Sequence, residues 1–256
     1  MRIVSYNILD GGIGRADPIG EVIAAQRADV IVLVEADDVD VVDRLVRRFK
    51  MDFVHAPGRG HSLAVLSRWT IVSSINHALV QPDAPRSLLE VTVQTPGGSE
   101  VPILALHLHA RATEDDETAR QHEMACVLRV AHDWRTNGVP HLLVGDFNSN
   151  APAQQIDPTR CKPSTQKAWH ANGEKIPRRV IQNILDHGYI DTLRASRAAA
   201  ADTMASFTTH EPGQRVDYVF AHGIDATLIE DAWIEQDRLA QFASDHYPVG
   251  AQINLR

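Results

Sequence analysis

The sequence is poor in the features that mark secreted, membrane-spanning and repetitive proteins. Its 256 residues include only two cysteines, Cys126 and Cys161, which is too few for a disulfide framework and fits a reducing compartment. No apolar run approaches the roughly 20 residues that a membrane span requires. The N-terminal residues MRIVSYNILD lack the basic and apolar regions of a signal peptide. These absences predict a soluble, cytoplasmic protein with no transmembrane segment.

Basic residues are also in deficit, with 25 Lys and Arg against 33 Asp and Glu and a net charge of -8. Such a chain does not attract polyanions through its overall field, so a nucleic-acid partner would need a local basic patch. One stretch offers it: residues 155–179, the basic segment, hold six basic and two acidic residues. The sequence leaves open whether this segment contacts substrate or only solvent.

The hydrophobic pattern alternates between runs of strand length and helical periods, which predicts a layered α/β fold. The length suits a single domain spanning residues 1–256, and the consecutive strands in its middle imply antiparallel pairing. Residues 151–178 show no periodicity and are expected to be irregular. We expect strands over 2–9, 29–36, 62–69, 70–75, 87–95, 101–109, 141–147, 217–221, 226–234 and 249–255, and helices over 17–28, 37–49, 113–137 and 177–188.

Polar residues recur at the point where predicted strands end. In layered α/β folds the carboxyl ends of strands form the crevice that binds ligands, so these side chains are expected to lie close together. Side chains two positions apart share one face of a strand, so Asp146 and Asn148 can point into the same space. The residues at strand ends are Asn7, Glu35, His107, Asp146 and Asn148. They are joined by Asp217, an expected buried carboxylate in an otherwise apolar strand, and by Asp245 and His246 just before the final strand.

This mixture of amides, carboxylates and histidines suits metal-assisted hydrolysis of a phosphoester. Carboxylate and amide oxygens are hard ligands of the kind that Mg²⁺ prefers. A carboxylate or a histidine can activate the attacking water, and a histidine held by an aspartate can stabilise the charge that develops on the phosphate. Amide donors such as Asn148 can orient the nucleophile or a phosphate oxygen.

Several short motifs carry these residues or lie between them: SYN with Asn7, VLVE with Glu35, SLAVLSR at 62–68, ALHLH with His107, GDFN with Asp146 and Asn148, RVDYVF with Asp217, and SDHYPV with Asp245 and His246. In these motifs the sequence resembles the endonuclease/exonuclease/phosphatase superfamily. The resemblance covers nearly the whole chain, and it rests on several short motifs in the family's order and rough spacing. It implies a DNase I-like fold, a four-layer α-β-β-α sandwich of two mixed β-sheets.

The resemblance also implies a role for each of these residues. The metal would be Mg²⁺, with Mn²⁺ as an alternative, at a site formed by Glu35, Asn7 and a second carboxylate, Asp245. Asp146 would orient or deprotonate the attacking water, with Asn148 beside it. The scissile phosphate would be gripped by two histidines, His107 and His246, and Asp217 would hold one of them.

The sequence departs from the family pattern at three places. Val34 stands where the family commonly has glutamine, and Leu106 stands where it has threonine. The acidic run EADDVD after Glu35 lacks the lysine of the AP-endonuclease branch, which disfavours cleavage of abasic DNA. The substrate therefore stays open among a small-molecule phosphoester, a lipid head group and nucleic acid, with a weak preference for a small or non-DNA phosphoester.

Other interpretations compete with a phosphoesterase. A non-catalytic binding module on the same fold is one, although every motif position keeps its polar residue. The segment GHSLA resembles a serine-hydrolase elbow centred on Ser62, but an elbow is followed by a helix and this segment continues as a strand. The pair His107 and His109 resembles a metallo-β-lactamase site, which continues with an aspartate and a histidine where this chain has Arg111 and Thr113. Taken singly, each residue could also serve only in a turn, a cap or a structural ion pair.

Overall fold

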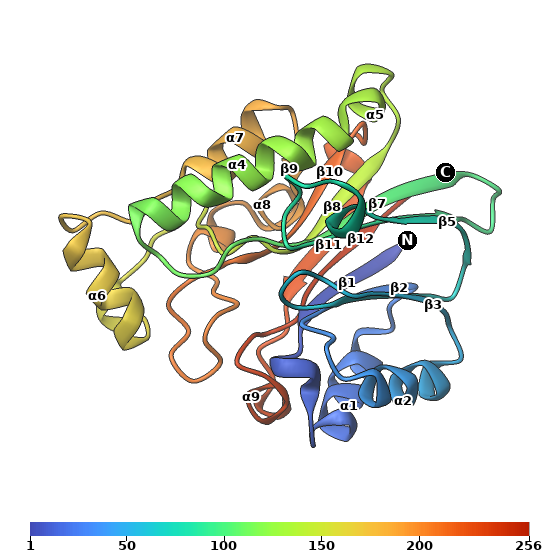
Figure 1. Ribbon diagram of the computed structural model, residues 1–256, viewed down its shortest axis with the longest axis horizontal. Helices are drawn as coiled ribbons and strands as arrows, with labels where there is room; N and C mark the ends of the chain where they lie inside the picture. Colours follow the sequence, from blue (N-terminus) through green and yellow to red (C-terminus); the bar gives the residue numbers. More distant parts are fainter. Residues whose placement is uncertain (256) are drawn as a thin grey trace.

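Two six-stranded β-sheets pack face to face between layers of helices in the computed structural model, which describes residues 1–255, Ala199 by its backbone alone (Figure 1). The order of the first sheet is β11-β12-β1-β2-β4-β3 and that of the second is β5-β6-β7-β8-β10-β9. The strands are β1 (Arg2–Asn7), β2 (Val30–Val34), β3 (Asp52–Ala56), β4 (Leu63–Ser67), β5 (Thr70–Asn76), β6 (Ser87–Gln94), β7 (Glu100–His107), β8 (His141–Asp146), β9 (Ile190–Asp191), β10 (Asp217–His222), β11 (Ile229–Ile234) and β12 (Val249–Ile253).

Each sheet contains a central parallel pair flanked by antiparallel strands. In the first sheet β1 runs parallel to β2, and in the second β7 runs parallel to β8. The other ladders are antiparallel, so both sheets are mixed, as predicted. Since the carboxyl ends of parallel neighbours lie at the same edge, each central pair brings two strand ends together.

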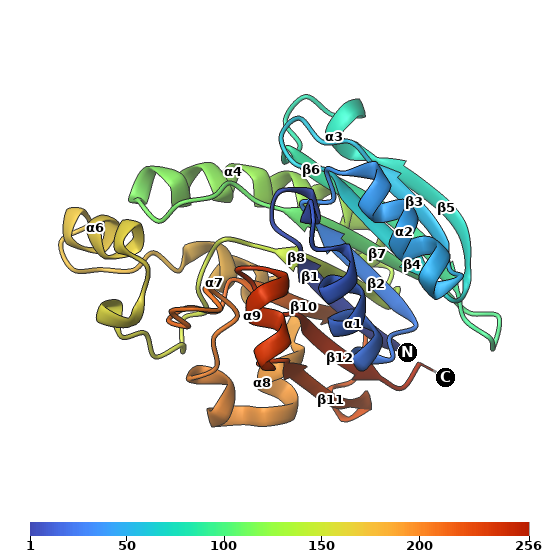
Figure 2. The ribbon, with the colours of Figure 1, turned by 90° about the horizontal axis from the view of Figure 1, so that it is seen from below.

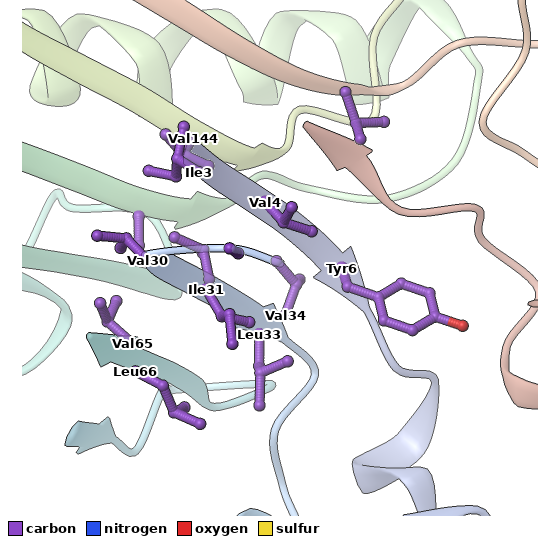
Figure 3. Packing of buried hydrophobic residues seen from close by; sticks show 14 of the residues in the cluster. Ile3, Val4, Tyr6, Val30, Ile31, Leu33, Val34, Val65, Leu66 and Val144 are labelled. Atoms are coloured by element: carbon purple, nitrogen blue, oxygen red, sulfur yellow. The ribbon is translucent and has the colours of Figure 1, made fainter. Parts of the chain in front are cut away.

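The core lies mainly between the two sheets. Residues alternate along each strand, and on β7 Ile103 and Ala105 join the cluster between the sheets while Leu104 and Leu106 face the helices on the outer side. Figure 3 shows part of the cluster on both faces of the first sheet, with side chains from β1, β2 and β4 and with Val144 of β8. Burial on both faces explains why these strands are continuous apolar runs.

Helices cover the outer face of each sheet. The amphipathic helices α1 and α2 lie over the first sheet, whereas α4 and α7 lie over the second (Figures 1 and 2). No helix within residues 1–255 is long and apolar enough to span a membrane. The helices are α1 (Ala16–Gln26), α2 (Val39–Phe49), α3 (His77–Val80), α4 (Glu114–Val130), α5 (His132–Thr136), α6 (Pro163–Ala171), α7 (Arg179–Asp186), α8 (Thr192–Arg197) and α9 (Arg238–Ala243).

The structure corrects the prediction that residues 151–178 are irregular. A 3-10 turn over 158–160 and helix α6 lie within this stretch, and α6 begins with Pro163 in its first turn. Only Thr165 and Ala168 of α6 are buried, because the helix stands away from both sheets (Figures 1 and 2). A helix that buries so little has no apolar stripe that periodicity could detect.

Two further differences concern the division of one helix and a strand that was not expected. The single helix expected over 113–137 is divided at Ala131 into α4 and α5. Strand β3 was not expected, because it is an edge strand whose first residues are exposed, Phe53 among them, so it lacks regular alternation.

Gly145 allows β7 and β8 to approach closely just before Asp146. Its φ is +147°, and an added Cβ would lie 2.0 Å from the carbonyl oxygen of Leu106 on β7. We therefore expect Gly145→Ala to lower the free energy of unfolding by roughly 3 kcal/mol or more, measured by urea denaturation. The control is Gly138→Ala, at φ +67° but in open space, which should cost only about 1 kcal/mol. Equal losses in the two variants would contradict this account of Gly145.

Candidate active site

The strand registers bring the predicted residues to one edge of the two sheets. On the first sheet Asn7 pairs with Val34, the residue before Glu35, and on the second His107 pairs with Asp146. Asp217 begins the antiparallel strand β10 directly opposite Asp146. Since the sheets face each other, these strand ends meet in one place, as the sequence predicted.

Asn7 links the acidic residues of the two sheets. Its amide nitrogen donates to Oε1 of Glu35 at 3.0 Å and to Oδ2 of Asp146 at 3.2 Å. Its amide oxygen accepts from the backbone N–H of Leu9 at 3.0 Å, which fixes the amide's orientation. The other oxygen of Glu35 accepts from the backbone N–H of Asp10 at 2.9 Å. Asn7 thus presents its NH₂ group to the carboxylates, and its oxygen is used within its own loop.

Two buried histidines stand on either side of Asp146. Nε2 of His107 lies 3.6 Å from Oδ2 of Asp146 and 4.0 Å from Oε1 of Glu35. Nε2 of His246 lies 3.8 Å from the same Asp146 oxygen, while its Nδ1 donates to Oδ2 of Asp217 at 2.8 Å. Asp217 is therefore the carboxylate that holds a histidine, the role that the resemblance implied.

The arginines near Asp217 are engaged elsewhere, which excludes a structural Arg–Asp217 pair. Arg215 forms a two-pronged ion pair with Asp191, with N–O distances of 2.9 and 2.6 Å. Arg178 donates to the backbone oxygens of Ala151 and Pro152.

Burial and charge separate the protonation behaviour of the three central groups. Burial opposes a charge on His246, but the neighbouring Asp217 outweighs it and raises the pKa of His246 to about 10. Burial and the like charge of Asp217 raise the pKa of Asp146 to about 7. Burial lowers the pKa of His107 to about 4, although Glu35 opposes this. At neutral pH the site thus holds one cationic and one neutral histidine, and Asp146 is near the midpoint of its titration.

Asn148 and Asp245 complete the predicted set. The backbone N–H of Asn148, at φ +48°, donates to Oδ1 of Asp146 at 2.8 Å, and its side-chain nitrogen donates to the oxygen of Leu108 at 3.0 Å. These contacts form an Asx turn, so Asn148 has a structural role in the turn as well as a place at the candidate site. Oδ1 of Asp245 is buried and has no hydrogen-bond partner within residues 1–255, and it lies 4.0 Å from Nε2 of His246.

A cavity of about 500 Å³ opens over these residues, and we call it the active-site cavity. Six of the eight predicted residues line it. Asn7 and Asp217 lie outside the lining, where Asn7 is hydrogen-bonded to Glu35 and Asp146, and Asp217 to His246. The six are Glu35, His107, Asp146, Asn148, Asp245 and His246.

The sequence did not single out several residues of this cavity. Nδ1 of His61 is hydrogen-bonded to Oδ2 of Asp37 at 2.7 Å, and the centre of its ring is 5.5 Å from that of His107. Burial lowers the pKa of His61, but the contact with Asp37 outweighs burial and raises it. Phe207 packs against His246 with ring centres 4.5 Å apart. Neither residue lies in a motif that predicts a role in the site, although His61 belongs to the GHSLA segment.

The donor atoms fit a hard divalent cation. One oxygen or nitrogen from each of Asp10, Glu35 and His61 lies within 4.8 Å of the others, so a cation could be shared among them. Asp245, whose Oδ1 is buried and has no partner within residues 1–255, lines the active-site cavity. Oxygen-rich, partly exposed sites of this kind suit Mg²⁺ or Mn²⁺, which keep several bound waters.

The two rival hydrolase sites are not formed. Ser62 is followed directly by strand β4, whereas a nucleophile elbow requires a helix at that point. His107 lines the active-site cavity through Nε2, but Nε2 of His109 is engaged by Asp116 at 2.9 Å. His109 is therefore hydrogen-bonded within its own part of the chain.

Comparison with known proteins agrees with this geometry. The model of the Endonuclease/Exonuclease/phosphatase family matches residues 4–246, so the chain belongs to that family. Among curated proteins, none matches the sequence significantly.

Solved structures share the fold at low sequence identity. The 3′ phosphatase NExo from Neisseria, bound to a product DNA hairpin, has a TM-score of 0.78 and 20% identity, with 100% of both chains covered. An AP endonuclease from Archaeoglobus fulgidus has a TM-score of 0.73 and 17% identity, again over 100% of both chains. The human Nocturnin catalytic domain, with a bound sulfate, has a TM-score of 0.69 and 16% identity over 98% of this chain and 93% of that one. The DNase I-like fold class is thereby confirmed.

The charge of Asp217 should set the protonation of His246. We expect Asp217→Asn, which keeps an acceptor for Nδ1 but removes the charge, to lower the pKa of His246 from about 10 toward the ordinary value near 6.5. The measurement is the pH dependence of the His246 imidazole signals in NMR spectra. Asp37→Asn, which removes a contact of His61 instead, should leave the His246 pKa unchanged. An unaltered His246 titration in Asp217→Asn would contradict the assignment.

Proposed function

We propose that the protein is a Mg²⁺-dependent phosphoesterase that hydrolyses a phosphomonoester or phosphodiester in the active-site cavity. The observation that carries this proposal is the arrangement of His107 and His246 on either side of the buried Asp146, with Glu35 on the opposing sheet. Membership of the Endonuclease/Exonuclease/phosphatase family supports it, as do structural neighbours described as a 3′ phosphatase and an AP endonuclease.

The chain's own groups divide the work on the phosphate. His246, held by Asp217 and cationic at neutral pH, donates from Nε2 to a phosphate oxygen and stabilises its growing charge. Neutral His107 contacts the same phosphate from the other side. Asp146 accepts the proton of the attacking water, a task that its raised pKa near 7 suits. Asn148 holds Asp146 in place through its backbone N–H.

We assign metal binding to the carboxylates at the mouth of the site. Glu35 and Asp245, predicted as ligands from the sequence, are joined in this proposal by Asp10. Asn7 orients Glu35 and Asp146 through its NH₂ group and is not itself assigned as a ligand, in contrast to the earlier expectation. When bound, the cation supplies Lewis acidity that polarises the phosphate and favours ionisation of the attacking water.

The same reasoning extends to location and substrate class. Both cysteines are free and buried, which supports a reducing compartment such as the cytoplasm. The DNA hairpin bound by the Neisseria neighbour keeps nucleic acid among the candidate substrates, beside small phosphoesters and lipid head groups.

Metal affinity should depend on Glu35. We expect Glu35→Gln to weaken Mn²⁺ binding by roughly tenfold or more, because one charged oxygen ligand is lost. Electron paramagnetic resonance of free Mn²⁺ measures this without any turnover. The control is Glu100→Gln, at the opposite end of β7, which should bind Mn²⁺ as the wild type does. Wild-type affinity in Glu35→Gln would remove Glu35 from the metal site.

Hydrolysis should require both the metal and Asp146. We expect the wild type to act on at least one of bis-p-nitrophenyl phosphate, p-nitrophenyl phosphate, plasmid DNA, RNA, inositol phosphates and sphingomyelin. Activity should vanish in EDTA and return with Mg²⁺. Asp146→Asn should lower the rate by about 10²-fold or more, because the proton acceptor is lost. The exposed Asp225, far from the cavity, provides the matched control Asp225→Asn, with unchanged rate.

Two outcomes would contradict this proposal. Activity that survives EDTA would show that the metal is not needed. Silence of the folded, Mn²⁺-binding protein across the whole panel would favour the non-catalytic binding module.

A further inference from the structure

A second cavity, of about 490 Å³, borders the active-site cavity. The two cavities share five lining residues, so a ligand could extend from one into the other. These are Ala110, Arg111, Asn148, Lys162 and Phe207. We call this second cavity the side pocket.

The side pocket is lined by cations and by no carboxylate, in a chain with a net charge of -8. Its charged residues are Arg111, Arg120, Lys162 and Lys167. Arg120 is neutralised by Glu117, with Nε and Nη2 3.0 and 2.9 Å from Oε2. The other three form no ion pair with any residue that the structure describes. The pocket therefore holds unneutralised positive charge.

Lys162 stands between the two cavities. Its Nζ lies 4.2 Å from the centre of the Phe207 ring, and that ring lies 4.5 Å from the ring of His246. The aromatic face holds the ammonium near the site while leaving its hydrogen-bond donors available.

Buried polar side chains add donors to the wall of the side pocket. Asn150 is 5% exposed, and its Oδ1 accepts from Nε2 of Gln214 at 3.2 Å. The NH₂ group of Asn150 and the hydroxyl of the equally buried Thr165 donate to no other group within residues 1–255. Both residues line the side pocket, so these unused donors suit a ligand with acceptor oxygens.

Hydrogen bonds hold the walls of the side pocket in place. Nη1 of Arg120 donates to the backbone oxygens of His109 and Arg111 at 2.8 and 2.6 Å, which fixes the loop on one side. Helix α6 forms the opposite side, and Asn172 at its C-terminal end donates to the oxygen of Ala112 at 2.9 Å. The basic segment thus forms part of the wall of a cavity beside the active site.

We propose that the side pocket binds a second phosphate group on a compact phosphoester whose scissile phosphate lies in the active-site cavity. This rests on the proposed phosphoesterase function and deepens it by naming the substrate class. Three unpaired cations match a group that carries a charge of about -1.5 to -2. A bounded cavity of this volume suits a small molecule, because a long strand would need a continuous groove.

Binding in EDTA tests the side pocket without turnover. Isothermal titration would compare glucose 1-phosphate with glucose 1,6-bisphosphate, and adenosine 3′-monophosphate with adenosine 3′,5′-bisphosphate. We expect the bisphosphate of at least one pair to bind roughly tenfold or more tightly, since charge-assisted contacts to phosphate are strong. Lys167→Ala and Lys162→Met should each reduce that advantage. Lys175→Ala removes a lysine of the same segment that does not line the side pocket, so it should keep the full advantage.

Two results would overturn the side-pocket proposal. One is equal affinity within both pairs, including no measurable binding of any member. The other is a bisphosphate advantage that Lys167→Ala and Lys162→Met leave intact.

Failure of this proposal is distinguishable from failure of the proposed function. Hydrolysis of simple phosphoesters with Mg²⁺, combined with equal binding of the paired ligands, would sink the side pocket alone. A bisphosphate preference that responds to the lysine variants, without hydrolysis of any phosphoester, would sink the phosphoesterase alone.

Discussion

The buried contact between Asp146, Asp217 and His246 is the constraint on which the rest of the site depends. Asp146 and Asp217 are each 1% exposed and face each other across one ladder, so their charges would repel strongly without a cation. His246 supplies that cation from the segment before β12, a strand of the other sheet. The electrostatic balance of the site therefore requires both sheets to be packed together.

The active site therefore combines residues fixed by the two sheets with a pocket built outside them. The central residues come from strand ends whose register is fixed by the hydrogen bonds between strands and by the apolar core. The side pocket is built from α6 and the loop held by Arg120, outside both sheets. Folds that place the reacting groups on a fixed scaffold and the substrate-binding groups on attached segments can change substrate without changing the chemistry.

Sequence patterns predicted the elements and site residues whose burial or backbone geometry produces a local pattern of residue types. The strands that carry Asn7, His107 and Asp146 are apolar runs with a polar terminus, and their gathering at one edge follows from parallel pairing. Helix α6 left no trace, because it buries only two side chains. Asp10 and His61 reach the site through long-range folding, so no local pattern shows them. That residues 1–256 form one domain stays a prediction.

The most direct test of the account is to locate the metal and the phosphate together. Crystals soaked with Mn²⁺ and inorganic phosphate would be measured for anomalous scattering from manganese. The account predicts a peak about 2.2 Å from a carboxylate oxygen of Glu35, with phosphate oxygens within hydrogen-bond distance of His107 and His246. A manganese peak away from Glu35, or a phosphate that contacts neither histidine, would contradict it.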